Sequence, residues 1–137
     1  MMRLGAVVLD SDKIEELSDF YARMLGWAKS TQILDGEKWI TVAKEDYSET
    51  PLLFQENLEY KRPKWPSEKE EQQQMIHLDF YVSMDEYESK IEHAIQCGAI
   101  MMESQFSDKW TVMADISGHP FCIIPLPNDI YEQRYGK

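Results

Sequence analysis

Residues that would indicate a disulfide scaffold or a structural zinc site are scarce in this sequence. Its 137 residues include two cysteines, Cys97 and Cys122, and three histidines. Two cysteines are too few for a disulfide framework, and these two form no C-x-x-C pair. We therefore expect two reduced thiols and no structural zinc site.

Long apolar runs and an excess of positive charge are also missing. No run approaches the roughly 18 apolar residues that a membrane-spanning helix needs, and the N-terminus lacks the pattern of a signal peptide. The chain has 14 basic and 25 acidic residues, a net charge of −11, which disfavours nucleic acid and anionic membranes as partners. The sequence thus predicts a cytoplasmic protein that binds neither.

Enough apolar residues are present for one sizeable core, because 43% of the chain is hydrophobic. An apolar segment at residues 4–9 predicts a strand, and apolar spacing over residues 14–25 predicts a helix that Gly26 ends. The candidate N-caps of that helix are Asp10, Ser11 and Asp12. The following strands are expected at residues 27–34, 37–44 and 51–56, with a hairpin turn at Asp35-Gly36.

The same pattern then restarts. Residues 75–82 predict a strand, and Ser83 is the expected cap of a helix that ends near Gly98. The buried face of that helix is predicted to comprise Tyr87, Ile91, Ala94 and Ile95. Further strands are expected at residues 100–105, 110–115 and 120–124.

Spacing supports a duplication, because 20 residues separate Ala6 from Gly26 and 21 separate His77 from Gly98. We predict an α+β fold with two βαβββ modules, a cupped mixed sheet and helices on its convex side. A single domain, residues 1–137, would hold module one, the connection, module two and the tail, at residues 3–57, 58–74, 75–126 and 127–137.

The connection and the tail each allow more than one interpretation. Residues 58–74 are charged and punctuated by proline, so they are either a linker or a flap whose apolar contact is Trp65. In the tail, Tyr131 and Tyr135 are four residues apart. This spacing predicts a short helix that packs on the other module or on a partner chain.

A candidate pocket follows from the alternation of side chains along strands. His77, Asp79 and Tyr81 share one face of the fifth strand, and Ala6 and Val8 share the corresponding face of the first. If the helices cover the opposite side, these residues line the concave face. The alternative is a histidine that only satisfies a structural hydrogen bond with Asp79 or Tyr81.

Three segments resemble a known family. Residues 14–27, with Phe20-Tyr21 and Leu25-Gly26-Trp27, resemble the first-module helix of the glyoxalase/bleomycin-resistance/extradiol-dioxygenase group, the vicinal oxygen chelate superfamily. Residues 77–99 are similar to its second module. Residues 110–122 are similar to the final hairpin of an uncharacterised glyoxalase-like subfamily. The resemblance implies the fold specifically, but it leaves the activity open.

The superfamily holds a metal with residues from the first, fourth, fifth and eighth strands. The resemblance carries these positions onto Ala6, Gln55 (or its neighbour Glu56), His77 and Cys122. Ala6 has no ligand atom, Gln55 offers a neutral amide, and Cys122 is a soft thiol, so only His77 matches. No cofactor is therefore predicted. A divalent metal held by His77 and Cys122 is the alternative, and His119 would join it only if it faced the concave side.

Three functions remain open at this point. The first is a metal-independent small-molecule binder of the bleomycin-resistance type, the second a glyoxalase-like lyase or isomerase, and the third a protein-interaction domain. The chemistry of lactoylglutathione lyase itself is not supported, because the resemblance ties it to the full metal set. An enzyme would use His77 and Asp79 as an acid–base pair, with Cys122 as a nucleophile or a buried thiol.

The predicted pocket comprises Ala6, Val8, Trp39, Gln55, His77, Tyr81, Trp110 and Cys122. The expected partners are an unknown small molecule and a second copy in a homodimer.

Overall fold

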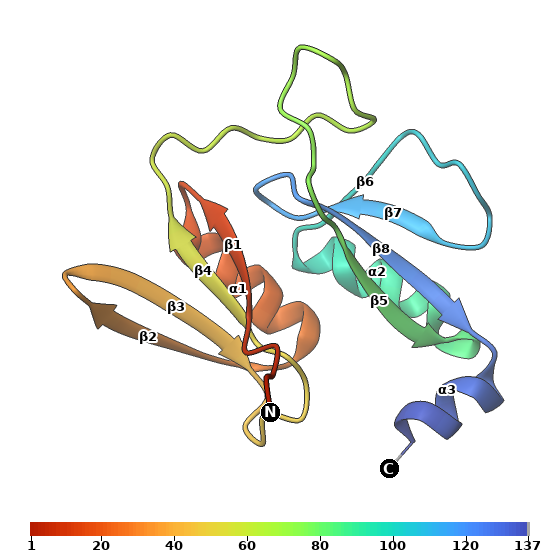
Figure 1. The fold of residues 1–137 in the computed structure, drawn as a ribbon. Coiled ribbons are helices and arrows are strands. Elements are labelled where there is room, and N and C mark those ends of the chain that lie inside the picture. Colours follow the sequence, from red (N-terminus) through yellow and green to blue (C-terminus); the bar gives the residue numbers. More distant parts are fainter. Residues whose placement is uncertain (137) are drawn as a thin grey trace. The chain divides into compact units, whose positions relative to one another are not determined.

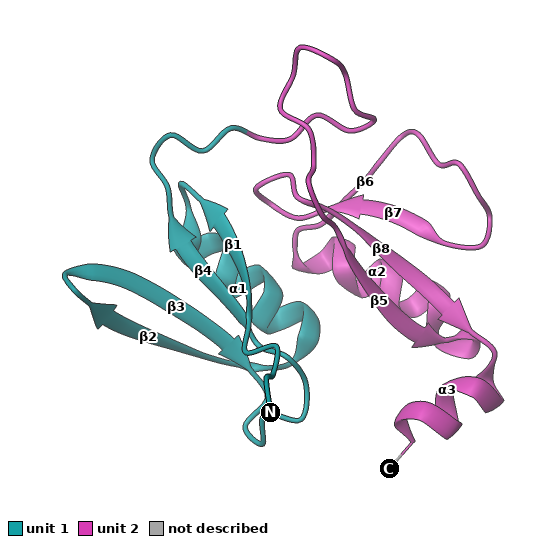
Figure 2. Cartoon of the chain, in the orientation of Figure 1, with its two compact units in different colours: residues 1–61 teal, residues 62–137 magenta. Residues whose placement is uncertain are grey.

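The computed structural model describes residues 1–136 and divides the chain into two compact units. Unit 1 comprises residues 1–61 and unit 2 starts at residue 62 (Figure 2). The boundary falls inside the predicted connection, residues 58–74. Within the described residues, no helix combines the length and the apolar character needed to cross a bilayer.

Unit 1 contains one mixed four-stranded sheet with a helix on one face (Figure 1). Its elements are β1 (Val7–Ser11), α1 (Ile14–Leu25), β2 (Ala28–Leu34), β3 (Glu37–Ala43) and β4 (Leu52–Glu56). The strand order is β1-β4-β3-β2, with β1 parallel to β4 and the other pairs antiparallel. Asp35 and Gly36 form the predicted hairpin turn, and both have positive φ angles.

Unit 2 repeats this arrangement. Its elements are β5 (Leu78–Ser83), a 3-10 turn (Met84–Glu86), α2 (Tyr87–Cys97), β6 (Ile100–Met101), β7 (Thr111–Ala114), β8 (Pro120–Leu126) and α3 (Asn128–Tyr135). The order β5-β8-β7-β6 matches that of unit 1, and β5 is parallel to β8. The predicted α+β fold of two βαβββ modules is therefore confirmed.

Helix α1 packs on its sheet through the face that its apolar spacing predicts. Ile14, Leu17, Phe20 and Tyr21 are at most 2% exposed, and the edge-to-face rings of Phe20 and Tyr21 lie 4.9 Å apart. Gly26 ends the helix with φ 71°, a left-handed conformation that glycine adopts without strain. The prediction of this helix, of its buried face and of its end at Gly26 is confirmed.

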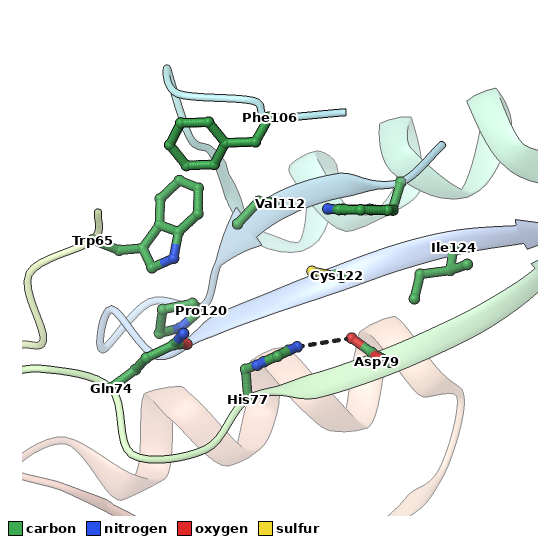
Figure 3. Close-up of a pocket in the computed structure, with 10 residues that line it drawn as sticks. Trp65, Gln74, His77, Asp79, Phe106, Val112, Pro120, Cys122 and Ile124 are labelled. Carbon is green, nitrogen blue, oxygen red and sulfur yellow. Dashed lines mark ion pairs between the residues drawn. The ribbon is translucent and has the colours of Figure 1, made fainter. Parts of the chain in front are cut away.

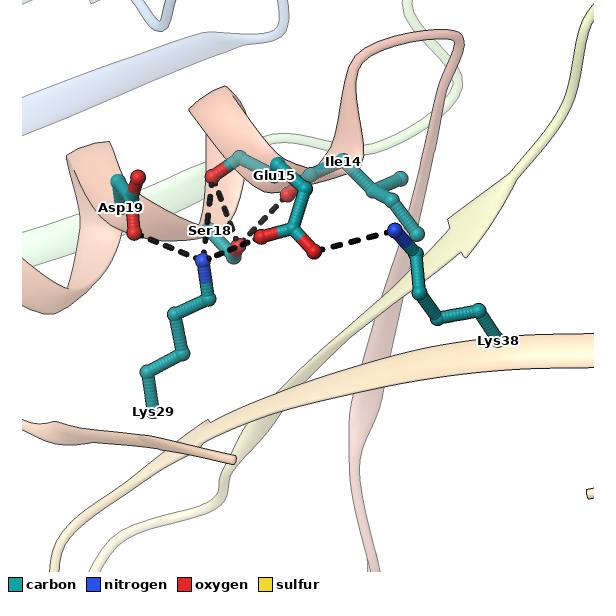
Figure 4. Close-up of polar contacts among 6 residues, drawn as sticks. All are labelled: Ile14, Glu15, Ser18, Asp19, Lys29 and Lys38. Atoms are coloured by element: carbon teal, nitrogen blue, oxygen red, sulfur yellow. Dashed lines mark hydrogen bonds and ion pairs between the residues drawn. The ribbon is translucent and has the colours of Figure 1, made fainter. Parts of the chain in front are cut away.

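An ion-pair network ties the exposed side of α1 to β2 and β3 (Figure 4). The Lys29 ammonium lies 2.8 Å from Glu15 and 2.7 Å from Asp19, and Lys38 lies 3.0 Å from Glu15. Lys29, followed by Lys38, lowers the pKa of Glu15. Partial burial opposes the charged form of Lys29, but its bonds to Asp19 and Glu15 outweigh this and raise its pKa. The network fixes the helix from the side that water reaches.

Helix α2 is less deeply buried than α1. Ala94 and Cys97 are buried, whereas Ile95, placed on the buried face by its spacing, is 44% exposed. The prediction is wrong for Ile95, because the buried stripe of the helix runs through Ala94 and Cys97 and Ile95 lies at its edge. Gly98 ends the helix as expected, with φ 120°.

Both parallel strand pairs start later than the sequence suggested. Residues 4–6 precede β1 and residues 75–77 precede β5, so the predicted strands were too long at their N-terminal ends. The Val7 N–H donates to the Pro51 carbonyl at 3.0 Å, but Pro51 has no N–H to donate to residue 5. Pro120 holds the corresponding position in unit 2. These two prolines end each ladder and leave Ala6 and His77 just outside it.

The predicted strand at residues 100–105 is reduced to the two residues of β6. The side-chain amide of Gln105 takes the place of a strand backbone: its oxygen accepts the Val112 N–H at 2.9 Å and its nitrogen donates to the Val112 carbonyl at 2.8 Å. The same nitrogen donates to the Met102 carbonyl at 2.8 Å. These bonds replace the ladder and fix the loop between β6 and β7.

The expected helix caps are not used as caps. The residue at the start of α1 is Lys13, and it makes no side-chain capping bond, while the Ser11 hydroxyl accepts its N–H at 2.9 Å. Ser83 makes no side-chain cap either, and Asn128 Oδ1 instead accepts the Asp85 N–H at 3.1 Å. Helix α3 forms as predicted, and it packs on β5 of its own unit.

Candidate functional site

The candidate site lies on the face of the unit 2 sheet that is turned away from its buried core. Asp79 on β5 is the register partner of Cys122 on β8, and His77 directly precedes β5. On the other face of the same strands, the rings of Phe80 and Phe121 meet edge to face at 5.6 Å. Alternation along β5 therefore aims His77 and Asp79 at the site, as the sequence predicted.

A pocket with a volume of about 390 Å³ opens on this face. It combines three aromatic rings, three aliphatic side chains and four polar or thiol side chains from unit 2 alone. The lining residues are Trp65, Gln74, His77, Asp79, Phe106, Trp110, Val112, Pro120, Cys122 and Ile124. A concave, mostly apolar surface with a few convergent polar groups is typical of a small-molecule site.

The polar groups of the pocket form a compact cluster. His77 Nε2 lies 3.2 Å from Asp79 Oδ1, and one ligand atom from each of His77, Asp79 and Cys122 lies within 4.8 Å of the others (Figure 3). Both side chains, His77 and Asp79, are partly open to solvent, with 44% and 40% of their surfaces exposed. The cluster is therefore reachable by a molecule in the pocket.

The thiol of Cys122 is held in its protonated form. Burial, followed by the negative charge of Asp79 and a hydrogen bond to that carboxylate, raises the pKa of Cys122 to about 11. A thiol with such a pKa is almost entirely neutral at pH 7 and is a weak nucleophile. The electrostatics thus favour the buried-thiol interpretation of Cys122 over the nucleophile.

The aromatic side of the pocket comes from two loops. Trp65 and Phe106 lie together across from Gln74, His77 and Asp79 (Figure 3), and their ring centroids are 5.5 Å apart. Gln105, which is bonded to Val112, precedes Phe106 and anchors its loop. Trp65 lies on the connection, residues 58–74, so this segment supplies one ring of the pocket.

Gln74 carries an unsatisfied acceptor. Within the described part of the chain, its Oε1 is the one buried side-chain nitrogen or oxygen atom without a hydrogen-bond partner. Because an unpaired buried oxygen is costly, it provides a place for a donor from a bound molecule. Sequence reasoning missed Gln74, since it stands among three glutamines in a polar stretch.

Only part of the predicted pocket comes together here. His77, Asp79, Trp110 and Cys122 line it, whereas Tyr81, which is 41% exposed, does not. The other predicted lining residues belong to unit 1, so their participation stays a prediction; they are Ala6, Val8, Trp39 and Gln55. Apart from Gln74, the lining residues that the sequence did not suggest are Phe106, Val112, Pro120 and Ile124.

Strand register corrects which residue of unit 1 corresponds to Cys122. Val7 and Leu52 open the β1–β4 ladder, as Leu78 and Phe121 open the β5–β8 ladder. The next pairs are Val8 with Leu53, and Asp79 with Cys122. Leu53, rather than Gln55, is therefore the counterpart of Cys122.

His119 does not join the cluster of His77, Asp79 and Cys122. Its Nδ1 lies 2.8 Å from Asp115 Oδ2, and Asp115 is fully buried. Asp115 Oδ1 also accepts the N–H groups of Ser117 and His119, at 2.9 and 3.0 Å. The pair organises the turn between β7 and β8, which is a structural role.

The donor atoms present fit a metal of the zinc type only within unit 2. Imidazole, thiolate and carboxylate are the usual zinc ligands, and the three donors are close enough to share one ion. The corresponding unit 1 positions are Ala6, Val8 and Leu53, none of which carries a ligand atom. The structure thus supports three donors from one unit, not the symmetric set of four that the resemblance implies.

Comparison with known proteins identifies relatives by fold. No curated protein matches the chain. Solved structures do match, and one is the fosfomycin resistance protein FosX from Listeria monocytogenes, in complex with Mn(II) and 1S,2S-dihydroxypropylphosphonic acid. It is 12% identical, with a TM-score of 0.67 and 98% of each chain covered.

Two further structures have the same fold. A glyoxalase/bleomycin resistance protein/dioxygenase family enzyme from Burkholderia phytofirmans is 16% identical, with a TM-score of 0.63 and 89% of this chain and 97% of that chain covered. The trypanothione-dependent glyoxalase I of Leishmania major is 9% identical, with a TM-score of 0.65 and coverage of 99% and 94%. The model of the glyoxalase-like domain matches residues 6–124, and the chain therefore belongs to the glyoxalase-like domain family.

Proposed function

We propose that this protein binds a small organic molecule in the pocket of unit 2 and acts by sequestration, as a bleomycin-resistance-type protein would. The observation that carries this proposal is the combination of Trp65, Phe106 and Trp110 with a cluster of polar groups around one pocket. Phe106 and Trp110 leave 71% and 39% of their surfaces exposed, and a bound molecule would cover this apolar area.

The symmetric set of four metal ligands that the resemblance implies is incomplete, which favours binding over the lyase chemistry tied to that set. Ala6 and Leu53 supply no ligand atom, so an ion would depend on His77, Asp79 and Cys122 of unit 2 alone. FosX is named for fosfomycin and was solved with a phosphonic acid. No lysine or arginine is among the residues that line the pocket, so an anionic phosphonate would meet no ammonium or guanidinium group there.

A thermal-shift screen of flat aromatic compounds against the purified protein tests this proposal. Compounds that bind raise the melting temperature, since they bind the native state and not the unfolded one. We expect the shift to disappear in Trp65→Ala and to persist in Trp27→Ala, a matched tryptophan in unit 1. Equal shifts in both variants would contradict the assignment to this pocket.

Enzymatic activity is the second candidate, and the group of His77, Asp79 and Cys122 favours it. These three residues would hold a zinc ion, which supplies Lewis-acid activation of an oxygen when bound. Without a metal, His77 paired with Asp79 would serve as a general base. Because the pKa of the Cys122 thiol is raised, this thiol would have to lose its proton to bind zinc, and it would take no part in the metal-free reaction.

Metal analysis distinguishes the two candidates. For the binder we expect no stoichiometric metal after purification in zinc-supplemented buffer. Stoichiometric zinc that is lost in His77→Ala and retained in His93→Ala would establish the metal site instead. A homodimer, predicted from the sequence, is tested separately by native mass spectrometry.

A further inference from the structure

The pocket of unit 2 offers hydrogen-bond acceptors and neither lysine nor arginine. Asp79 contributes a carboxylate, one oxygen of which lies 3.2 Å from His77 Nε2, and Gln74 contributes a buried oxygen without a partner. No ammonium or guanidinium group is present among the lining residues. A molecule that brings N–H donors satisfies these acceptors, whereas a molecule that brings a carboxylate or phosphate adds repulsion.

The opposite side of the same pocket is suited to a ring. Trp65 and Phe106 stack in a tilted pair, and Trp110 adds a third ring to the lining. Between them and the polar side lie Val112, Cys122 and Ile124 on β7 and β8, which are apolar or neutral at pH 7. Aromatic faces attract flat rings, and they also attract cations that lie over them.

The charge of the whole chain acts in the same direction. With a net charge of −11, the protein raises the local concentration of cations near its surface and lowers that of anions. Asp79 is 40% exposed in its side chain, so a cation reaches it without a large rearrangement. Local acceptors, aromatic rings and overall charge therefore favour one class of molecule.

We propose that this pocket selects flat aromatic compounds that carry a protonated amine, with the ring beside Trp65, Phe106 and Trp110 and the charged nitrogen at Asp79. This inference rests on the proposed function, because a pocket that holds no small molecule has no ligand preference. It goes further by giving the charge and shape of the ligand.

Three indole compounds with the same ring and different charge test the proposal by isothermal titration calorimetry. Tryptamine is cationic, indole-3-propionamide is neutral and indole-3-propionate is anionic at pH 7. We expect tryptamine to bind about tenfold more tightly than the amide, and the propionate to bind more weakly than both. Equal affinities for the three would overturn the charge preference and leave the binding function standing.

Variants assign the preference to a residue. Asp79→Asn keeps the shape of the side chain, and we expect it to weaken tryptamine binding about tenfold while changing amide binding less than about twofold. Asp129→Asn removes the same charge from an exposed position on α3 and is expected to change neither affinity. A matching loss in Asp129→Asn would attribute the effect to net charge and overturn the role of Asp79.

The outcomes separate this inference from the proposed function. Absence of heat with all three compounds at millimolar concentration, together with no hit in the thermal-shift screen, would overturn the binding function itself. Binding that is strongest for the propionate would overturn only the inference. If Asp79→Asn fails to fold, the comparison of the three compounds on the unaltered protein still decides.

Discussion

The two sheets share a strand order, but the faces turned away from their buried cores differ in chemistry. In unit 2, His77, Asp79 and Cys122 form a polar cluster at the start of the parallel ladder. At the same places unit 1 has Ala6, Val8 and Leu53, which are all apolar. One aromatic position is kept in both units, since Trp39 is the counterpart of Trp110.

The difference shows how a duplicated scaffold can keep its packing and change its sites. The ladders begin at Pro51 and Pro120 in the two units, and Ile40, Phe54, Met113 and Phe121 are fully buried. These positions face the helices and preserve the fold. Positions that face outward do not carry the core, so they are free to differ between the units.

The largest effects should come from the two cores. We expect Phe54→Ala and Phe121→Ala each to lower the free energy of unfolding by about 3–5 kcal/mol, because both rings are fully buried. Hydrogen exchange should accelerate mainly in unit 1 for the first and in unit 2 for the second. Val8→Ala, at a 44% exposed position, is the control. Equal acceleration in both units would show that the units unfold as one.

The turns before β4 and β8 should differ next. In unit 2 the buried Asp115 bonds two backbone N–H groups and the His119 ring, so Asp115→Ala should cost about 3 kcal/mol. In unit 1 the exposed Asp46 accepts the Ser48 N–H at 3.0 Å, and Asp46→Ala should cost far less. Chemical denaturation measures both. Similar losses would contradict the view that burial makes the difference.

The edge strands provide a smaller contrast. Strand β2 pairs with β3 over seven residues, whereas β6 pairs with β7 over two and Gln105 substitutes for the rest. Gln105→Ala should cost about 1–2 kcal/mol and expose the Val112 N–H, which hydrogen exchange detects directly. Gln32→Ala in β2 removes only exposed side-chain bonds and should leave the ladder protected. Unchanged exchange of the Val112 N–H in the Gln105→Ala variant would contradict the view that the Gln105 side chain replaces ladder bonds.

The Cys122 thiol of unit 2 should show the smallest effect, through the pH dependence of stability. Leu53 cannot ionise, but Cys122 has a pKa raised to about 11 by burial and by Asp79. Its contribution to stability is present below the ordinary pKa of 9.0 and is lost as the pH rises toward 11, because the unfolded thiol ionises first. In a Cys97→Ser background, alkylation should follow the raised pKa, and Asp79→Asn should lower it. An alkylation midpoint near pH 9.0 in the Cys97→Ser protein would contradict a raised pKa of Cys122.

Much of the fold could be predicted because the repeat leaves local signals. The apolar spacing of α1, the glycines that end both helices and the Asp35-Gly36 turn are local features, and all three are confirmed. The predicted N-terminal ends of β1 and β5 were wrong, because Pro51 and Pro120 end the two parallel ladders. Such a cause depends on register, which Leu52 to Gln55, an apolar run followed by an amide, does not reveal.

The candidate site could be predicted in part. His77 and Asp79 share a face by alternation along one strand, Cys122 was implied by the family resemblance, and Trp110 was suggested by its place on a predicted strand. Gln74 and Phe106 lie in loops without periodicity, so no pattern singles them out. Their positions depend on tertiary bonds such as those of Gln105 to Val112.

The most direct test of the account uses the four tryptophans, which lie two in each unit. Nitrogen-15 NMR resolves one indole N–H signal for each of Trp27, Trp39, Trp65 and Trp110, and unlabelled tryptamine adds none. On titration with tryptamine, we predict that the signals of Trp65 and Trp110 move while that of Trp27 stays in place. Still signals of Trp65 and Trp110, whatever the Trp39 signal does, would contradict the assignment of the binding site to unit 2.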